Sequence, residues 1–487
     1  MSSVRAPVPW KWVALLAAVK LGVTTAVADR YGWHRDELYY LASSHHLAFG
    51  YVDYPPLVPL LAAADQAIAP GSLVALRALP ALAGAVIIVL TALIARELGA
   101  GTRAQAWAAF ALLLSPMFIG GNLMFQTVAF DELVWAIAVF AFARLLRDGN
   151  QRLWPLAGLV IGVGLETKFT IAALPVAILL GIMVTGRRSV LASPWPWIGV
   201  GVATLLFLPN LAWQATHDWI SVQYTISHHG NTDGPVAFWL QQLLLFNPLF
   251  LVPGVAGLVT LHRDARFAPL VYAVIGVELI FFAAGGKAYY PAPVYPVIYA
   301  AGAMWLDQRL RSTIGLTAFA AASLALILVL LPIGLPVLPV KTMVSMKLWQ
   351  ARKDYADMIG WPELAQETAQ VYNALPANQK ANAIILTQNY GEAGAVDYYG
   401  PALGLPKAIS PHLTYWYWAP PHLDPSTVVM VGFNPEVAGR YFAVCRQAGT
   451  VTNTLGIHND EFGAPILVCT NPRQTLWSVW RSLQTLD

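Results

Sequence analysis

The sequence predicts a polytopic α-helical membrane protein with a small C-terminal extracytoplasmic α/β domain. Apolar residues make up 57% of the 487-residue chain and charged residues only 11%, whereas soluble domains usually carry about 25% charged residues. The apolar residues also gather in long runs, and about eleven of these approach the roughly 17–25 residues with which a helix crosses a bilayer. The net charge of +3 is too small and too scattered to indicate a nucleic-acid partner.

The expected membrane spans come in close succession over the first two thirds of the chain. They occupy residues 12–28, 72–95, 104–121, 128–146, 153–167, 170–186, 195–213, 236–261, 267–284, 290–306 and 313–333. A shorter apolar stretch at 57–69 is interrupted by Asp65 and Gln66. We expect it to form a helix that lies on the membrane surface, with a re-entrant turn as the alternative.

Basic residues indicate the orientation of the chain. Alternate loops are rich in arginine, and the positive-inside rule makes these loops cytoplasmic. They contain Arg96, Arg103, Arg144, Arg147, Arg152, Arg187, Arg188, Arg263, Arg266, Arg309 and Arg311. The N-terminus is then cytoplasmic, and the loop from His34 to Pro56 is external. An odd number of spans also places the residues after Pro339 outside, so we expect a multi-pass protein of the plasma membrane.

The composition changes near residue 340, which divides the chain into a predicted multi-helix membrane domain (1–339) and an external α/β domain (340–487). Polar residues increase after this point, and four short runs have strand character. The strand-like runs are Ala383–Leu386, Thr427–Gly432, Tyr441–Cys445 and Pro465–Cys469, with helical stretches at Trp361–Tyr372 and Glu392–Tyr399. Cys445 and Cys469 form either a disulfide, as an oxidising space allows, or two buried thiols.

The His34–Pro56 loop is the densest polar stretch in the apolar part of the sequence. Asp36 and Glu37 follow the first span closely, with His34 and Arg35 beside them. The apolar residues around them would hold this segment against the bilayer; they are Leu38, Tyr39, Leu41, Leu47 and Phe49. A carboxylate held there could remove a proton from a hydroxyl group at the membrane surface. The alternative is a pair of solvated acids.

A second acidic pair, Asp131 and Glu132, begins the span at 128–146 and lies on the same predicted face. Acids in a membrane-spanning bundle are functional candidates, although they could also only complement a helix dipole. Basic residues are few on this face, and a phosphate there would need them as donors. The candidates are Lys168, Lys287, His228 and His229, with Tyr289 and Tyr290 as further hydroxyl donors or as ordinary interfacial aromatics.

Other chemistry finds little support in the sequence. His45 and His46, with Asp53, are weak candidates for a metal site; no cofactor is otherwise indicated, and a divalent metal remains an open alternative. The sequence has no glycine-rich nucleotide loop and no Gly-x-Ser-x-Gly motif. A sugar donor would therefore reach this protein on a lipid and not on a nucleotide.

Four segments resemble the C-type membrane glycosyltransferases, in the branch that contains protein O-mannosyltransferases and bacterial aminoarabinose transferases (glycosyltransferase family 39). Residues 36–40, Asp-Glu-Leu-Tyr-Tyr, resemble the acidic motif of the family's first external loop. Residues 50–57 resemble its Pro-Pro entry into the interfacial helix, residues 130–133 its second acidic position, and residues 287–296 its late Lys/Arg–Tyr-Tyr–Pro segment. The resemblance covers roughly the first 300 residues.

This resemblance implies an inverting transfer of a sugar from a polyprenyl phosphate to an acceptor on the external face. The acceptor would be a cell-envelope lipid, a glycan or a protein. Asp36 would be the general base, Asp131 would position the acceptor or the base, and Lys287, Tyr290 and the loop of His228 and His229 would hold the donor phosphate. Arg35, Asp53 and Tyr54 would lie in the acceptor loop. Tyr54 departs from the aminoarabinose transferases, which carry a lysine just before Pro-Pro, and this argues against transfer of aminoarabinose to lipid A.

Two other classes of function remain as alternatives. A transporter or flippase for lipid-linked sugars would need paired repeats and broken helices near the membrane midplane, and the sequence indicates neither. A non-catalytic envelope protein could instead bind glycans through Tyr415, Trp416, Tyr417 and Trp418.

Overall fold

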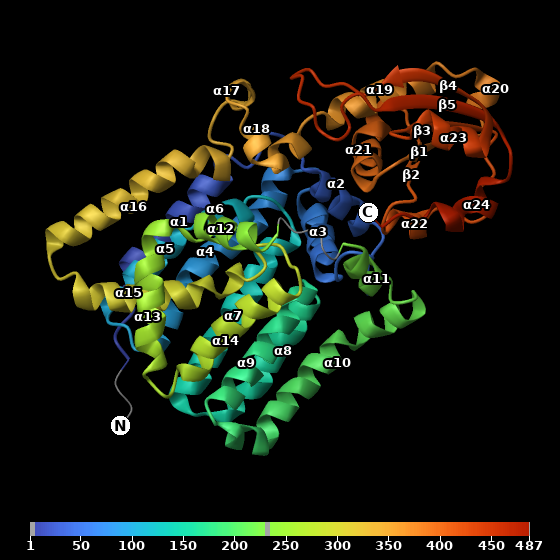
Figure 1. Cartoon of the computed structure of the whole chain (residues 1–487). Helices are drawn as coiled ribbons and strands as arrows, with labels where there is room; N and C mark the ends of the chain where they lie inside the picture. Colours follow the sequence, from blue (N-terminus) through green and yellow to red (C-terminus); the bar gives the residue numbers. More distant parts are fainter. Residues whose placement is uncertain (1–4, 229–233, 487) are drawn as a thin grey trace.

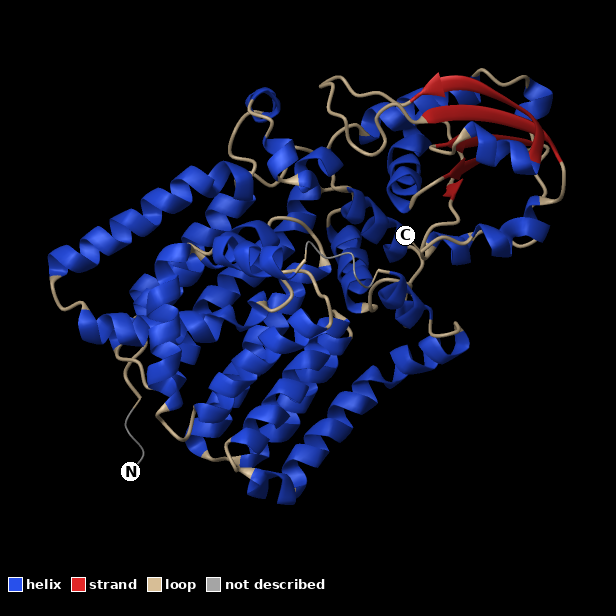
Figure 2. Cartoon of the chain, viewed as in Figure 1, coloured by secondary structure: helices blue, strands red, loops and turns tan. Residues whose placement is uncertain are grey.

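A large helical part and a smaller part that contains a β-sheet follow one another along the chain (Figures 1 and 2). The computed structural model describes residues 5–228 and 234–486. The helices of the first part are α1 (Trp10–Thr25), α2 (Arg35–Ser44), α3 (Leu57–Ile68), α4 (Leu73–Leu98), α5 (Thr102–Leu113), α6 (Pro116–Gly121), α7 (Thr127–Asp148), α8 (Trp154–Leu165), α9 (Ala173–Val184), α10 (Pro194–Thr216), α11 (Ile220–Ser227), α12 (Pro235–Phe246), α13 (Leu251–His262), α14 (Ala268–Ala283), α15 (Tyr295–Arg309) and α16 (Thr313–Gly334).

Capping residues set the ends of the long helices. The Ser72 side chain accepts a hydrogen bond from the Ala75 amide (3.2 Å) and begins α4, which ends at Gly99 in the left-handed conformation (φ 102°). Helix α7 likewise ends at Gly149 (φ 66°). Glycine adopts this backbone conformation without the steric cost of a Cβ atom, and serine satisfies a free amide at a helix start.

Prolines break two of the expected spans. Ser115 precedes Pro116 and is extended, so the stretch 104–121 forms the separate helices α5 and α6. Asn247 precedes Pro248 and has a positive φ of 74°. There the chain bends by 93° between α12 and the following segment Pro248–His262. A proline disfavours the helical conformation of the residue before it, which is consistent with both breaks.

Each expected span coincides with a helix or a pair of helices, but the number of spans is not settled by their length. In the two described ranges, three helices are long and apolar enough to cross a membrane, namely α4, α10 and α16, and the bent pair would be a fourth. Several others, such as α8 and α9, have only 12 residues. At 1.5 Å per residue they are about 18 Å long, which is less than the roughly 30 Å of a bilayer core. The count of about eleven remains a prediction.

The second part contains a mixed five-stranded sheet in the order β2-β1-β3-β5-β4. Strands β1, β2 and β3 are parallel, whereas β5 runs antiparallel to both β3 and β4. Its elements are α17 (Val340–Ser345), α18 (Leu348–Ala351), the 3-10 helix η6 (Lys353–Met358), α19 (Trp361–Asn373), α20 (Ala377–Lys380), β1 (Ala383–Thr387), α21 (Tyr390–Tyr399), β2 (Ala408–Ile409), α22 (Tyr415–Trp418), β3 (Thr427–Val431), α23 (Pro435–Tyr441), β4 (Phe442–Thr450), β5 (Pro465–Pro472) and α24 (Leu476–Leu483).

All four strand-like runs and both helical stretches that we expected after residue 340 are present. Among the five strands of the sheet, β2 was missed, because a strand of two residues leaves no recognisable pattern. Cys445 and Cys469 lie opposite each other on β4 and β5, and their sulfur atoms are bonded. Of the two alternatives left open by the sequence, the structure therefore has the disulfide. The boundary between residues 339 and 340 follows the end of α16 and remains a prediction as a domain border.

Helix α2 packs against α21 of the second part, and one cluster of buried residues includes side chains from both. We expected Leu38, Tyr39 and Leu41 to press against the bilayer. This is wrong, because all three are buried inside the protein. Leu47 and Phe49 do lie on the surface, with exposures of 54% and 65%. The second part of the chain, and not the membrane alone, therefore holds α2.

The contact between these helices is close at Gly394. A Cβ atom at this position would lie 2.9 Å from the Leu38 Cβ and 3.1 Å from its carbonyl carbon, which is closer than such atoms approach. We expect Gly394→Val to force α21 away from α2 and to destabilise the protein by about 1–3 kcal/mol. Thermal unfolding of the purified protein in detergent measures this effect. Gly439→Val in α23, where a Cβ meets nothing within 4 Å, is the control, and equal midpoints for the two variants would contradict the close contact.

Candidate active site

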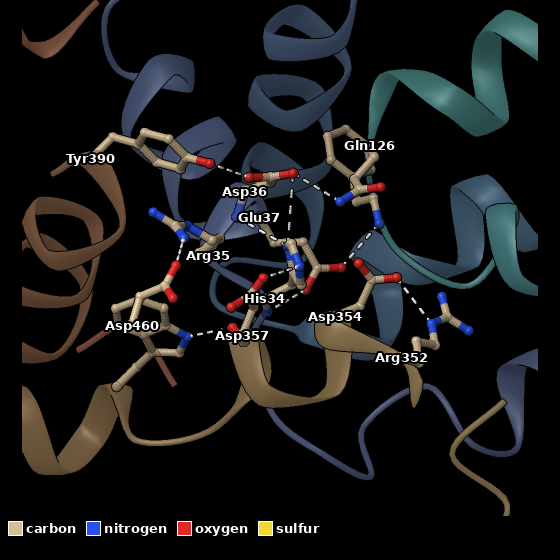
Figure 3. A network of polar contacts seen from close by, with 12 residues as sticks. His34, Arg35, Asp36, Glu37, Gln126, Arg352, Asp354, Asp357, Tyr390 and Asp460 are labelled. Atoms are coloured by element: carbon tan, nitrogen blue, oxygen red, sulfur yellow. Dashed lines mark hydrogen bonds and ion pairs between the residues drawn. The ribbon is translucent and has the colours of Figure 1, made fainter. Parts of the chain in front are cut away.

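Helix α2 begins with a capping box that fixes the first acidic pair. His34 Nδ1 accepts a hydrogen bond from the Asp36 amide (3.2 Å), and Glu37 Oε2 accepts one from the His34 amide (2.9 Å). Both acids thus lie in the first turn of a helix, where its dipole favours negative charge. Figure 3 shows the polar network around this turn.

Glu37 is fully buried and paired with Arg77 of α4. Its Oε2 lies 2.6 Å from Arg77 Nη2, and its Oε1 accepts hydrogen bonds from Arg77 Nε (2.8 Å) and from the Phe125 amide (2.9 Å). Arg77 also donates to the carbonyl oxygens of Ala28 and Gly32. Burial opposes ionisation of Glu37, but Arg77 outweighs it and lowers the pKa of this carboxyl. Every acceptor position of Glu37 is thus occupied by a donor of the protein, and its expected catalytic role remains a prediction.

Asp36 has a different environment, although it is the adjacent residue. Its Oδ1 accepts a hydrogen bond from the Tyr390 hydroxyl (2.7 Å) and its Oδ2 one from Gln126 Nε2 (2.8 Å). The side chain remains 31% exposed, and His34 Nδ1 lies 3.8 Å from Oδ2. The carboxylate is therefore held in one orientation by two donors and is still accessible (Figure 3).

The second acidic pair lies apart from Asp36. Asp131 accepts hydrogen bonds from Trp135 Nε1 (3.0 Å) and from Thr170 Oγ1 (2.9 Å). Glu132 accepts one from Asn122 Nδ2 (2.8 Å). Both acids are buried in α7, and within residues 5–228 and 234–486 no hydrogen bond or ion pair joins either of them to Asp36. A catalytic or positioning role of Asp131 remains a prediction.

The predicted basic and aromatic residues from two loops do come together. Lys168 Nζ lies 5.3 Å from the ring centre of Tyr289 and 4.8 Å from that of Tyr290. Burial, then Tyr290, Asp354 and Asp36 raise the pKa of Tyr289 well above its ordinary value, so its hydroxyl keeps its proton. Lys287 is exposed, and its charge acts on Asp354. These groups form a cationic and hydroxyl-bearing surface near the acidic turn.

The histidines contribute less than expected. The ring of His228 is tilted by 39° against that of Tyr224, with ring centres 4.2 Å apart, and its Nδ1 lies 2.9 Å from the Tyr224 carbonyl oxygen. His229 lies outside the described residues. His46 stacks on Trp418 at 4.5 Å, while His45 is exposed. No group of three or more metal-ligating side chains occurs in the part of the chain that the structure describes.

The other acceptor-loop candidates have separate environments. Asp53 Oδ1 accepts a hydrogen bond from the Tyr39 hydroxyl (3.2 Å). Burial, and then the charge of Asp36, raise the pKa of Asp53 to about 8. Tyr54 is buried, with its hydroxyl 2.6 Å from Ser43 Oγ, so it does not present a polar group where the related lysine would. Arg35 Nη1 lies 3.4 Å from Asp460 Oδ2, and its guanidinium lies 5.0 Å from the Tyr390 ring centre.

Sequence reasoning missed the residues that complete this network. Gln126 precedes the second acidic pair, and Tyr390 belongs to the second part of the chain. Arg352 Nε donates to Asp354 Oδ2 (2.9 Å), and Asp357 Oδ2 lies 3.9 Å from His34 Nε2. Burial opposes ionisation of Asp354, but Arg352, His34 and Lys287 together lower its pKa. The charged segment 352–357, which follows α17 and α18, was the available signal; Gln126 and Tyr390 had none.

Comparisons with known proteins show similarity in one segment of the sequence and in the fold. Residues 53–213 match the family model described as dolichyl-phosphate-mannose-protein mannosyltransferase. The fold is similar to the crystal structure of ArnT from Cupriavidus metallidurans bound to undecaprenyl phosphate, with a TM-score of 0.61 and 18% identity over 94% of this chain and 98% of that one. The apo state of the same ArnT gives a TM-score of 0.60, also at 18% identity and with the same coverage. No curated protein sequence matches the chain.

A third structure, the oligosaccharyltransferase AglB from Archaeoglobus fulgidus in complex with an inhibitory peptide and a dolichol-phosphate, is only distantly similar. Its TM-score is 0.48 at 13% identity, over 82% of this chain and 64% of that one.

The chain therefore has a mostly helical, ArnT-like membrane fold, and residues 53–213 match a mannosyltransferase family model. The resemblance drawn from the four sequence segments is thereby confirmed.

The buried pair of Glu37 and Arg77 gives a first prediction for this site. Arg77→Met leaves Glu37 buried without its counter-charge, and we expect it to destabilise the protein by about 3–5 kcal/mol. The double variant Glu37→Gln/Arg77→Met removes the unpaired charge and should recover part of the loss. Thermal midpoints of the two variants in detergent measure the difference, and a double variant less stable than Arg77→Met would contradict a dominant ion pair.

Asp53 gives a prediction on pH. Its pKa of about 8 in the folded protein lies above the value of about 4 in an unfolded chain. The folded state therefore binds a proton that the unfolded state releases, and this contribution to stability is complete at low pH and lost as the pH rises through 8. Asp53→Asn should therefore raise the thermal midpoint by a few degrees at pH 9 and by less at pH 5. Each kcal/mol of added stability raises the midpoint by about 2–4 °C.

The exposed acid Asp424 provides the control for this experiment. Asp424→Asn should shift the midpoint equally at both pH values. An Asp53→Asn variant whose midpoint follows that of the wild type at both pH values would show that this carboxyl does not bind the extra proton.

Proposed function

We propose that the protein transfers a sugar from a polyprenyl-phosphate donor to an acceptor on the extracytoplasmic face, with inversion, and that Asp36 is the general base. The observation that carries this proposal is the state of the Asp36 carboxylate. Two donors orient it while 31% of its side chain stays exposed. Glu37, by contrast, has no free acceptor position, and Asp131 is only 4% exposed. A base needs both a fixed direction and access to the substrate.

In the proposed reaction, Asp36 takes the proton of an acceptor hydroxyl. The acceptor oxygen then attacks the anomeric carbon of the sugar from the face opposite to the phosphate. The bond between that carbon and the phosphate oxygen breaks, and the polyprenyl phosphate leaves with the electron pair. This single displacement inverts the configuration at the anomeric carbon, and the protonated Asp36 returns its proton to solvent through its exposed edge.

The donor phosphate would bind on the surface formed by Lys168, Lys287, Tyr289 and Tyr290. Lys287 is exposed and, within the described ranges, forms no hydrogen bond or ion pair with the protein. Two ammonium groups and two protonated phenols match the charge and the acceptor oxygens of a phosphate. Undecaprenyl phosphate, which is bound in the similar ArnT structure, is the natural first ligand to test.

The sugar and the acceptor are proposed as classes. The family match favours a mannose-like hexose, with a pentose as the alternative. Tyr54 is buried against Ser43 where aminoarabinose transferases carry a lysine, and this argues against lipid A as the acceptor. The acceptor is a hydroxyl of a cell-envelope glycan, lipid or protein.

Mass spectrometry of envelope lipids, glycans and proteins from cells with and without the gene product identifies the species that the protein makes. We expect Asp36→Asn, expressed in the deletion strain, to reduce this product by about 10²–10⁴-fold, because the amide cannot accept the proton. The protein level and the thermal midpoint should stay near those of the wild type. Asp460→Asn, an acid that is 82% exposed on the same side, is the control, and full product with Asp36→Asn would overturn the assignment of the base.

A further inference from the structure

The position of Tyr390 points to a role for the second part of the chain in the reaction. This residue begins α21, and its hydroxyl donates to Asp36 Oδ1 over 2.7 Å, across 354 positions of the sequence. The other carboxylate oxygen is held by Gln126 from the end of the loop before α7. One of the two orienting donors of Asp36 therefore comes from the membrane part of the chain and the other from the part after residue 340.

Tyr390 is fixed on several sides, so its hydroxyl has little freedom. Its ring stacks on Tyr39, with ring centres 4.6 Å apart, and on His412 at 5.2 Å. The guanidinium of Arg35 lies 5.0 Å from the ring centre, and the Tyr390 amide donates to His412 Nδ1 (3.3 Å). A tyrosine that served only to fill the contact between α2 and α21 would not need its hydroxyl directed at a carboxylate.

The chemistry of the phenol suits this task. Burial, and then the charge of Asp36, raise the pKa of Tyr390 well above its ordinary value, so the hydroxyl remains a donor at physiological pH. A neutral donor can hold one oxygen of the carboxylate without removing its charge. An ammonium or guanidinium group in the same place would compete more strongly with the acceptor hydroxyl for the base.

We propose that Tyr390 is a positioning residue for Asp36, so that the part of the chain after residue 340 must be docked on α2 for the base to face the acceptor. The proposal rests on the proposed function of Asp36. The orientation of the base would then depend on the hydrogen bond between Tyr390 and Asp36, which joins the two parts of the chain.

Tyr398 offers a matched control in the same helix. Its hydroxyl donates to the Gly71 carbonyl oxygen over 3.1 Å. It therefore also joins α21 to the membrane part, but through a residue outside the network of Asp36. Tyr390→Phe and Tyr398→Phe each remove one hydroxyl group and its hydrogen bond between the two parts, and both variants keep the aromatic ring. A role in docking alone predicts the same result for both variants.

The test compares wild type, Asp36→Asn, Tyr390→Phe and Tyr398→Phe in three measurements. These are the amount of product formed in the deletion strain per amount of folded protein, the Kd for undecaprenyl phosphate, and the thermal midpoint. We expect Tyr390→Phe to lower product formation by about 10- to 100-fold, as small errors in the placement of reacting groups do. Its Kd and midpoint should equal those of Tyr398→Phe, which should form product like the wild type.

The outcomes separate the two proposals. Full product with Tyr390→Phe, while Asp36→Asn forms none, would overturn the positioning role and leave the base in place. Equal losses of product in both tyrosine variants, with lowered midpoints, would show that Tyr390 is only a docking contact. This result would also overturn the positioning role. Full product with Asp36→Asn would overturn the proposed function itself, and so would a wild-type protein that does not bind undecaprenyl phosphate.

Discussion

The buried ion pair between Glu37 and Arg77 is the interaction on which the site depends. It connects the start of α2, the start of α4, the segment after α1 and the loop before α7, because Arg77 and Glu37 together also bind backbone groups of Ala28, Gly32 and Phe125. Successive residues of a helix point about 100° apart. With Glu37 directed into the protein, Asp36 is turned toward the side where α21 packs. The buried Glu37 thus determines where Asp36, the proposed base, points.

Two neighbouring carboxyl groups serve different tasks because their surroundings differ. Glu37 has a buried arginine and two backbone amides, which stabilise its charge. Asp36 has neutral donors and partial access to solvent. Asp53, farther along the same loop, has burial and one phenol, and its proton is retained to about pH 8. Such divergence of nearby carboxyl groups is a recurring feature of acid–base sites, and here it arises within one short loop.

Local patterns in the sequence predicted much of the fold. Each long apolar run became a helix or a pair of helices, and the strand runs after residue 340 became β1, β3, β4 and β5. Periodicity and composition act over a few residues, and for these elements they were sufficient. The packing of α2 against α21 could not be predicted in this way, because Leu38 and Gly394 are far apart in the sequence and meet only in the folded chain. For the same reason Asp36 was identified as a candidate, whereas Tyr390 and Gln126 were not. The ion pair of Glu37 was also missed, because nothing near it in the sequence indicates that Arg77 is its partner.

The outermost helix α16 has a further consequence. Only Ser323 and Ile327 of its residues are buried, unlike most residues of α4, and its side chains are almost all apolar. In a bilayer such a surface contacts lipid tails. The apolar side chains of α16 are then surrounded mainly by lipid and not by other helices of the protein. It is also the last helix before the part of the chain that carries Tyr390. A detergent that replaces those lipids poorly would loosen α16, while the core around α4 stays packed. The choice of detergent is therefore a variable in every activity measurement on this protein.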